Sequence, residues 1–303
     1  MKQPTNLLEA IRYFSDLDVA TEFVAKLRWP DGPVCPRCGA AEPSYLSTRR
    51  IWKCKGCKRQ FSVKVGTIFE DSALGFDKWL PAIWLAANSK NGISSHELAR
   101  SLGITQKSAW FMLHRIRLAM QSGGFDKLAG AVEVDETFIG GKARNMHKHI
   151  RKQKIHGTGA TDKTIVLGMR ERGGDVRATI IDKVERAQIY PHVYANVETG
   201  SKLYTDTHQA YRTIGKDFAH ETVDHAEAYV VGQVHTNGLE NFWALLKRGL
   251  HGTYVSVQPF HLFRYLDERM FTYNMRDLTD FGRFALVLHQ TAGRRLTWLE
   301  LTA

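Results

Sequence analysis

The most constraining feature of this sequence is a set of four cysteines arranged as two Cys-x-x-Cys pairs. The pairs are Cys35 with Cys38 and Cys54 with Cys57. Each pair presents two thiolates on one tight turn, so the two pairs together supply the four ligands of a tetrahedral Zn²⁺ ion. Fifteen residues separate the pairs, and short strands are expected at Ile51–Cys54 and Gln60–Phe69. The segment is therefore interpreted as a structural zinc ribbon, since a redox dithiol would need only one pair.

No cysteine remains for a disulfide framework, which favours a reducing compartment. The net charge of +11 favours a polyanionic partner, with nucleic acid ahead of an anionic membrane surface. A basic but unspecialised enzyme is the alternative. The first ten residues lack the pattern of a secretory signal, and the apolar stretch Trp79–Ala87 is too short to span a bilayer. We expect a soluble cytoplasmic protein associated with the nucleoid.

Residues 76–122 are expected to be helical and to contain a helix-turn-helix motif. Ser94 and Glu97 fit a capping box, Gly103 supplies the turn, and Thr105 caps a second helix over Gln106–Met120. The beginning of such a second helix enters the major groove of DNA. The candidate DNA contacts are Gln106, Lys107, Ser108, Phe111 and Arg115. An ordinary helical hairpin that does not bind DNA is the alternative.

A strand is expected at Ala131–Ile139, and it carries three carboxylates among apolar residues. Side chains alternate between the faces of a strand, so Glu133 and Asp135 share one face, while Glu136 lies on the other with the valines. Burying carboxylates beside apolar side chains is costly unless a cation or a hydrogen-bond donor compensates them. That cost is the reason to expect a metal site at this strand.

A basic stretch follows that strand, with six Lys or Arg and no acidic residue from Lys142 to Lys154. We interpret it as a phosphate-binding loop, with a solvated insertion as the alternative. The spacing of His147, His149 and His156 could also suggest a metal site, but the phosphate-binding loop is the preferred interpretation. The candidate DNA contacts here are Lys148, Arg151, Lys152 and Lys154.

Two later segments supply partners for Asp135. Asp206 ends a short strand, where open α/β sheets place their ligands, although an aspartate at this position also fits a helix cap. Glu240 lies on an amphipathic helix beginning at Asn237, and Lys247 returns to the same side two turns later, as on many solvated helix faces. Asp135, Asp206 and Glu240 would hold two Mg²⁺ ions, and Lys247 would contact a phosphate.

The order of the elements after residue 126 predicts an α/β fold. A three-strand meander is expected over 131–139, 163–170 and 175–183, followed by a helix at 187–197, a strand at 202–206 and a short helix at 207–214. A strand at 221–223 and helices at 237–250, 258–274 and 280–290 complete the pattern. The expected architecture is a mixed sheet flanked by helices.

Three segments together indicate a protein family more specifically than any single carboxylate does. They are EVDETFIGGK, LYTDTHQAY and HTNGLENFWALLKRGLHGTY. They resemble bacterial insertion-sequence transposases of the DDE type, specifically the ISXO-type group with an N-terminal zinc ribbon. The resemblance extends from about Pro33 to about Asn274. It implies a ribonuclease-H-like catalytic domain that uses Mg²⁺ or Mn²⁺ to cleave and transfer DNA strands at terminal inverted repeats, and it implies a homodimer or higher oligomer on double-stranded DNA.

Carried over by motif, the resemblance implies a triad of Asp135, Asp206 and Glu240, with Lys247 as the following basic residue. The third position varies in this group, so Asn237 and Asn241 are rivals to Glu240. We expect four regions: a helical segment (1–30), the ribbon (31–70), the helix-turn-helix region (71–125) and the catalytic domain (126–303). A two-metal nuclease without strand transfer, and a DNA-binding regulator that does not need the carboxylates, are the alternative functions.

Overall fold

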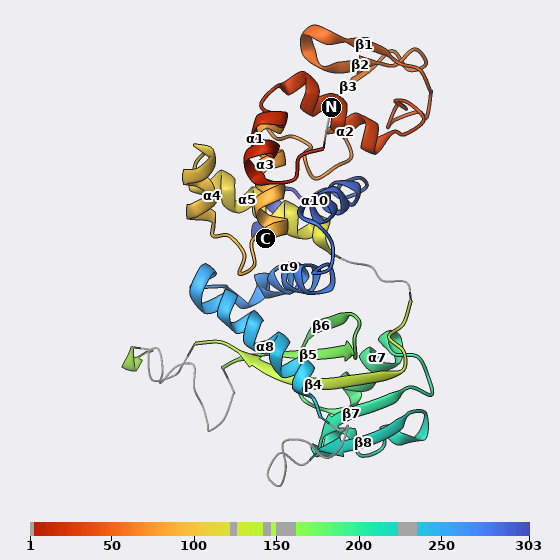
Figure 1. Cartoon of the computed structure of the whole chain (residues 1–303), viewed down its shortest axis with the longest axis vertical. Coiled ribbons are helices and arrows are strands. Elements are labelled where there is room, and N and C mark those ends of the chain that lie inside the picture. The colour runs from red at the N-terminus through yellow and green to blue at the C-terminus, as the bar shows by residue number, and fades with distance from the viewer. Residues whose placement is uncertain (1–2, 122–125, 142–146, 150–161, 224–234) are drawn as a thin grey trace. The chain divides into compact units, whose positions relative to one another are not determined.

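The computed structural model describes residues 3–121, 126–141, 147–149, 162–223 and 235–303 (Figure 1). The chain divides into two compact units, Met1–Gln121 with Met275–Ala303, and Ser122–Asn274. Within the described residues, no helix combines the length and the hydropathy that crossing a bilayer requires.

The first unit is helical apart from the ribbon, and its helix starts follow from the sequence. Its helices are α1 (Leu7–Phe14), α2 (Leu17–Arg28), α3 (Phe76–Asn88), α4 (Ser95–Leu102), α5 (Gln106–Met120), α10 (Asp280–His289) and α11 (Trp298–Thr302). The side chain of Asp16 accepts hydrogen bonds at the start of α2, which explains the break after α1. Ser94 and Thr105 cap α4 and α5 in the same way, and Gly103 ends α4 with a φ of 64°. The expected helix-turn-helix pair is therefore present.

The C-terminal helices α10 and α11 belong to this first unit, whereas the sequence predicted residues 275–303 to be part of the catalytic domain. The physical reason is an aromatic cluster. The ring of Phe284 on α10 lies 5.6 Å from that of Phe14 and 5.2 Å from that of Trp84, and it stacks on Phe23. The sequence alone does not indicate this packing, because the partner rings lie 200 to 270 residues earlier in the chain.

The ribbon is a three-stranded antiparallel sheet in the order β1-β2-β3. Its strands are β1 (Ser44–Leu46), β2 (Ile51–Lys53) and β3 (Gln60–Phe61). The strand expected over Gln60–Phe69 is confined to two residues, Gln60 and Phe61. The Lys64 ammonium donates to the carbonyls of Ser72 and Leu74, and these bonds hold the following segment in turns.

The second unit contains a five-stranded sheet in the order β6-β5-β4-β7-β8. Its strands are β4 (Ala131–Ile139), β5 (Thr164–Glu171), β6 (Val176–Ile181), β7 (Lys202–Asp206) and β8 (Ala219–Val223). The first three pair antiparallel as a meander, whereas β4, β7 and β8 pair in parallel. An antiparallel meander continued by parallel strands beside its first member is the ribonuclease-H-like arrangement, so the expected fold class is confirmed.

Helices cover both faces of this sheet (Figure 1). Helix α7 (Arg186–Asn196) packs on a core that includes Val132, Val134 and Leu203. Helices α8 (Asn237–Gly249) and α9 (Leu262–Asn274) pack on the opposite core, which includes Val166 and Val176. Helix α8 contacts both β4 and β5, so its residues lie over the centre of the sheet.

The prediction of a helix at residues 207–214 is wrong. The segment forms two short 3₁₀ turns, Gln209–Tyr211 and Ile214–Lys216. The carboxylate of Asp206 accepts the backbone N–H of His208, and the His208 ring accepts that of Ala210. These local bonds satisfy the backbone in a turn and compete with helix formation.

Candidate active site and zinc site

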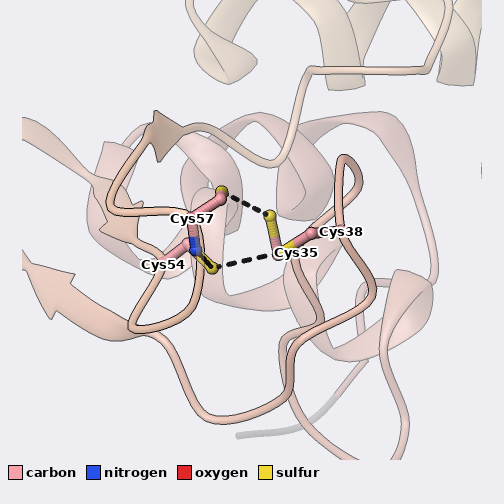
Figure 2. A group of neighbouring side chains, drawn as sticks. All are labelled: Cys35, Cys38, Cys54 and Cys57. Atoms are coloured by element: carbon pink, nitrogen blue, oxygen red, sulfur yellow. Dashed lines mark hydrogen bonds between the residues drawn. The ribbon is translucent and has the colours of Figure 1, made fainter.

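The four cysteines converge on one point in the ribbon (Figure 2). Their sulfur atoms all lie within 4.8 Å of one another, with Cys35 Sγ 3.8 Å from Cys57 Sγ and Cys38 Sγ 3.5 Å from Cys54 Sγ. Zn–S bonds of 2.3 Å in a tetrahedron put ligand sulfurs about 3.8 Å apart. The donor set and its spacing therefore fit one Zn²⁺ ion, as the sequence predicted.

Backbone geometry prepares this cluster for a metal. The backbone N–H of Cys57 donates to Cys54 Sγ at 3.4 Å, and it is the main cause that lowers the pKa of Cys54 to about 6. Burial and the neighbouring thiols act in the opposite direction on Cys57 and raise its pKa. The four groups carry their charge together only when a cation is shared among them.

The alternation expected for β4 is confirmed. Residues Val132 to Ile139 pair with Glu171 to Thr164 in unbroken register, so no bulge interrupts the two faces. Val132 and Val134 enter the core under α7. Glu133 and Asp135 lie on the other face, where both contact residues of α8. The carboxylate of Asp135 is therefore presented to the helix that carries Glu240.

Asp135 and Asp206 lie level with each other on neighbouring strands. The parallel pairing of β4 with β7 matches Glu133 to Tyr204, and two further residues along each strand bring Asp135 beside Asp206. Asp206 is the last residue of β7, and its Oδ1 accepts the backbone N–H of His208 at 3.0 Å. This bond forms an Asx turn rather than a helix cap, and it holds the carboxylate at the strand end.

The charges of Asp206 and Glu240 both act on Asp135. Burial is the main cause that raises the pKa of Asp135 to about 6; the hydrogen bond from Trp243 lowers it, and the two other carboxylates raise it further. Glu240 is exposed on α8, three residues before Trp243, whose indole N–H reaches Asp135 Oδ2 at 2.9 Å. Glu240 therefore lies on the part of α8 that adjoins Asp135.

The carboxylates are less tightly clustered than the thiolates. Among the residues that the structure describes, only the four cysteines form a group of three or more His, Cys, Asp or Glu side chains compact enough to hold a single ion. Asn237 and Asn241 are exposed, and Lys247 is partly buried, on the same helix as Glu240.

Glu133 is a site residue that the sequence did not assign. Its fully buried carboxylate lies 3.2 Å from Arg172 Nε and 3.6 Å from Arg170 Nη1, and it accepts the backbone N–H of Leu239 at 2.9 Å. The compensation for this buried charge is therefore two guanidinium groups and a helix N-terminus, not a metal. A Cβ on Gly238 would lie 2.6 Å from the same carboxylate, so the helix approaches this closely only with glycine there. The cost of burying a carboxylate was the sequence signal for Glu133. The sequence does not show which groups compensate its charge.

Glu136 lies on the opposite face from Asp135, as alternation requires. The hydroxyl of Tyr211, which is fully buried, donates to Glu136 Oε1. Burial is the main cause that raises the pKa of Glu136 to about 7, and the charges of Asp135 and Asp206 add to it. Glu136 therefore ties β4 to the turn that follows β7.

One predicted DNA contact on α5 is wrong. Arg115 is only 5% exposed, and its guanidinium donates to the backbone carbonyls of Ile68, Glu70 and Leu296. It holds the first unit together and has no face toward a groove. Phe111 is partly buried and packs against Trp298 of α11 at a ring distance of 5.4 Å.

The first turn of α5 keeps the predicted polar surface. Lys107 is exposed, with its ammonium 4.5 Å from the centre of the Trp298 ring. Gln106 is exposed and donates to Ser95 Oγ, and Ser108 is partly buried beside Thr105. In the basic stretch Lys148 is exposed, whereas Arg151, Lys152 and Lys154 lie outside the described residues.

Comparison with known proteins gives three matches to these features. A family model described as the ISXO2-like transposase domain matches residues 127–274, which contain the whole five-stranded sheet. A model described as the transposase zinc-ribbon domain matches residues 16–60. A Halobacterium salinarum protein, described as an uncharacterized protein in transposable element ISH50, is 30% identical over 244 residues, which cover 76% of this chain and 82% of that protein.

Proposed function

The chain belongs to the ISXO2-like transposases that carry an N-terminal zinc ribbon, and from this premise we propose that it cleaves and transfers DNA strands at the terminal inverted repeats of an insertion sequence. The observation that supports the proposal is the placement of Asp135 level with Asp206 on neighbouring strands, with the charges of Asp206 and Glu240 both acting on Asp135, within the segment that the family model spans.

In this proposal the three carboxylates hold two Mg²⁺ or Mn²⁺ ions. Carboxylate oxygens are the ligands that these ions prefer. Two ions about 3.5–4 Å apart also need ligands spread over more space than a single ion does, which agrees with the looser spacing of this group. Bound ions would activate water or a 3′-hydroxyl and stabilise the leaving oxygen.

We assign the third ligand to Glu240 rather than to Asn237 or Asn241. The charge of Glu240 acts on Asp135, and the hydrogen bond from Trp243 keeps this part of α8 against β4. A carboxylate also neutralises a divalent ion, which an amide cannot do. Lys247, two helical turns after Glu240, would contact a phosphate of the DNA as a point charge.

The remaining polar surface is proposed to hold double-stranded DNA. The net charge of +11 suits binding to the phosphate backbone. Gln106, Lys107 and Ser108 at the start of α5 would read the repeat, and the basic residues Lys148, Arg151, Lys152 and Lys154 would contact phosphates. Because two transposon ends must be joined to a target, we propose a homodimer or higher oligomer on DNA.

The test uses purified protein and a labelled duplex that carries the inverted repeat found beside the gene. Nicking at the repeat boundary in Mg²⁺ but not in EDTA, and its loss in Asp135→Ala, are expected. Joining of the cut end to a second duplex distinguishes a transposase from a nuclease of the same fold. Tight binding without any cleavage would contradict the proposal and favour a DNA-binding regulator.

A further inference from the structure

The indole of Trp243 lies between α8 and the sheet with its single polar atom directed at the active site. The side chain is 5% exposed and packs among apolar residues of the core under α8 and α9. Its Nε1–H donates to Oδ2 of Asp135 at 2.9 Å. An indole has no other hydrogen-bonding group, so this is the one hydrogen bond that the Trp243 side chain can donate.

The sheet has a gap shaped for this ring. Gly168 on β5 pairs directly with Asp135 on β4, and opposed residues of an antiparallel pair point to the same face. A Cβ on Gly168 would lie 2.4 Å from Trp243 Cζ2 and 2.5 Å from Cη2, closer than real contacts allow. A glycine within a strand weakens the sheet but permits such a close approach. The indole therefore takes the place of a side chain at position 168.

We propose that Trp243 is a positioning residue of the metal site: it holds one oxygen of Asp135, so that the other is directed toward the ions, and it fixes the turn of α8 that carries Glu240. This inference rests on the proposed function of Asp135 as a metal ligand. Groups that orient a metal ligand from behind change metal affinity by about 10- to 100-fold when removed. The cause is that an ordered carboxylate loses less conformational freedom when the ion binds.

The test measures Mn²⁺ binding to the full-length, zinc-loaded protein by electron paramagnetic resonance. Trp243→Phe keeps most of the ring and removes the N–H, and about tenfold weaker Mn²⁺ binding is expected. The matched control is Trp79→Phe in the other unit. Trp79 is 1% exposed and its Nε1–H donates to Ser72 Oγ at 3.0 Å, so the same change removes a buried indole hydrogen bond that involves none of the three carboxylates. The control should bind Mn²⁺ as the wild type does.

Gly168→Ala and Asp135→Ala complete the set. Gly168→Ala keeps the tryptophan but displaces its ring, and it should weaken Mn²⁺ binding in the same direction as Trp243→Phe. If Asp135→Ala abolishes binding while Trp243→Phe stays within twofold of wild type, the role of Trp243 is overturned and the proposed function stands. If Asp135→Ala also binds Mn²⁺ normally, both are overturned.

A measurement on the unmodified protein covers the case in which a variant fails to fold. The chain has seven tryptophans, so selective ¹⁵N labelling gives at most seven indole N–H signals. Paramagnetic Mn²⁺ at substoichiometric concentration should broaden the signal of Trp243. Absence of broadening in every indole signal would contradict the proposal.

Discussion

The cysteine cluster and the carboxylate group assemble their ligands in different ways. All four thiolates come from residues 35–57, on two turns of the ribbon, and their sulfurs meet at a single point. The carboxylates come from β4, β7 and α8, and their proximity depends on how those elements pack in the folded unit. A local spacing thus specifies the first site, whereas packing across the sheet specifies the second.

The largest expected effect concerns the locally built site. Cys54→Ser removes one of four zinc ligands, so the ribbon should release zinc and lose a folding contribution on the order of 10 kcal/mol. Metal analysis and limited proteolysis of residues 31–70 measure this. Lys55→Ser, an exposed change on the same turn, is the control and should keep its zinc. Full zinc content in Cys54→Ser would show that these thiolates do not form the site.

The second prediction separates chemistry from binding in the assembled site. Asp206→Asn should lower the rate of strand cleavage by about a thousandfold or more, because metal binding needs the charged carboxylate. DNA affinity should change by less than about threefold, which is well under 1.4 kcal/mol. Asp182→Asn, an exposed carboxylate just after β6, is the control. An affinity loss of tenfold or more in Asp206→Asn would contradict its assigned role.

The third prediction concerns the ion cluster that holds α8 against β4. Glu133→Gln leaves Arg170 and Arg172 without their buried counter-charge, so the free energy of unfolding should fall by about 3 kcal/mol. Denaturant unfolding measures this, and Glu221→Gln, exposed on β8, should have little effect. Unchanged stability in Glu133→Gln would mean that the cluster does not anchor the helix.

The smallest effects distinguish two basic residues of α5. Arg115→Ala leaves three backbone carbonyls without their donor and should cost about 2 kcal/mol of stability, with the salt dependence of DNA binding unchanged. Lys107→Ala should leave stability unchanged and reduce the slope of log affinity against log salt by about one. If Arg115→Ala instead reduced the salt dependence of DNA binding and left stability unchanged, Arg115 would be a DNA contact after all.

The parts that the sequence predicted correctly depend on short-range patterns. The cysteine spacing identified the zinc ribbon, and alternation along β4 placed Asp135 and Glu136 on opposite faces. Capping residues located the starts of α4 and α5. Each of these signals arises within a few residues, where backbone geometry decides the outcome.

The parts that the sequence missed depend on contacts between distant segments. The sequence predicted Arg115 as a DNA contact because its hydrogen-bond acceptors, at residues 68, 70 and 296, are distant in the chain and could not be recognised. The partners of Glu133 are likewise distant in the chain: Arg170 lies on β5, Arg172 directly follows it, and Leu239 lies on α8. Gly168 did carry a signal, since a glycine inside a strand marks a close approach, but only the structure identifies Trp243 as the side chain that fills the gap.

The most direct test of the central claim is anomalous diffraction from crystals grown with Mn²⁺, with data collected on both sides of the manganese and zinc edges. Manganese peaks are predicted in contact with Asp135, Asp206 and Glu240, and a zinc peak among the four cysteines. A zinc peak accompanied by manganese elsewhere, with none at Asp135, would contradict the account.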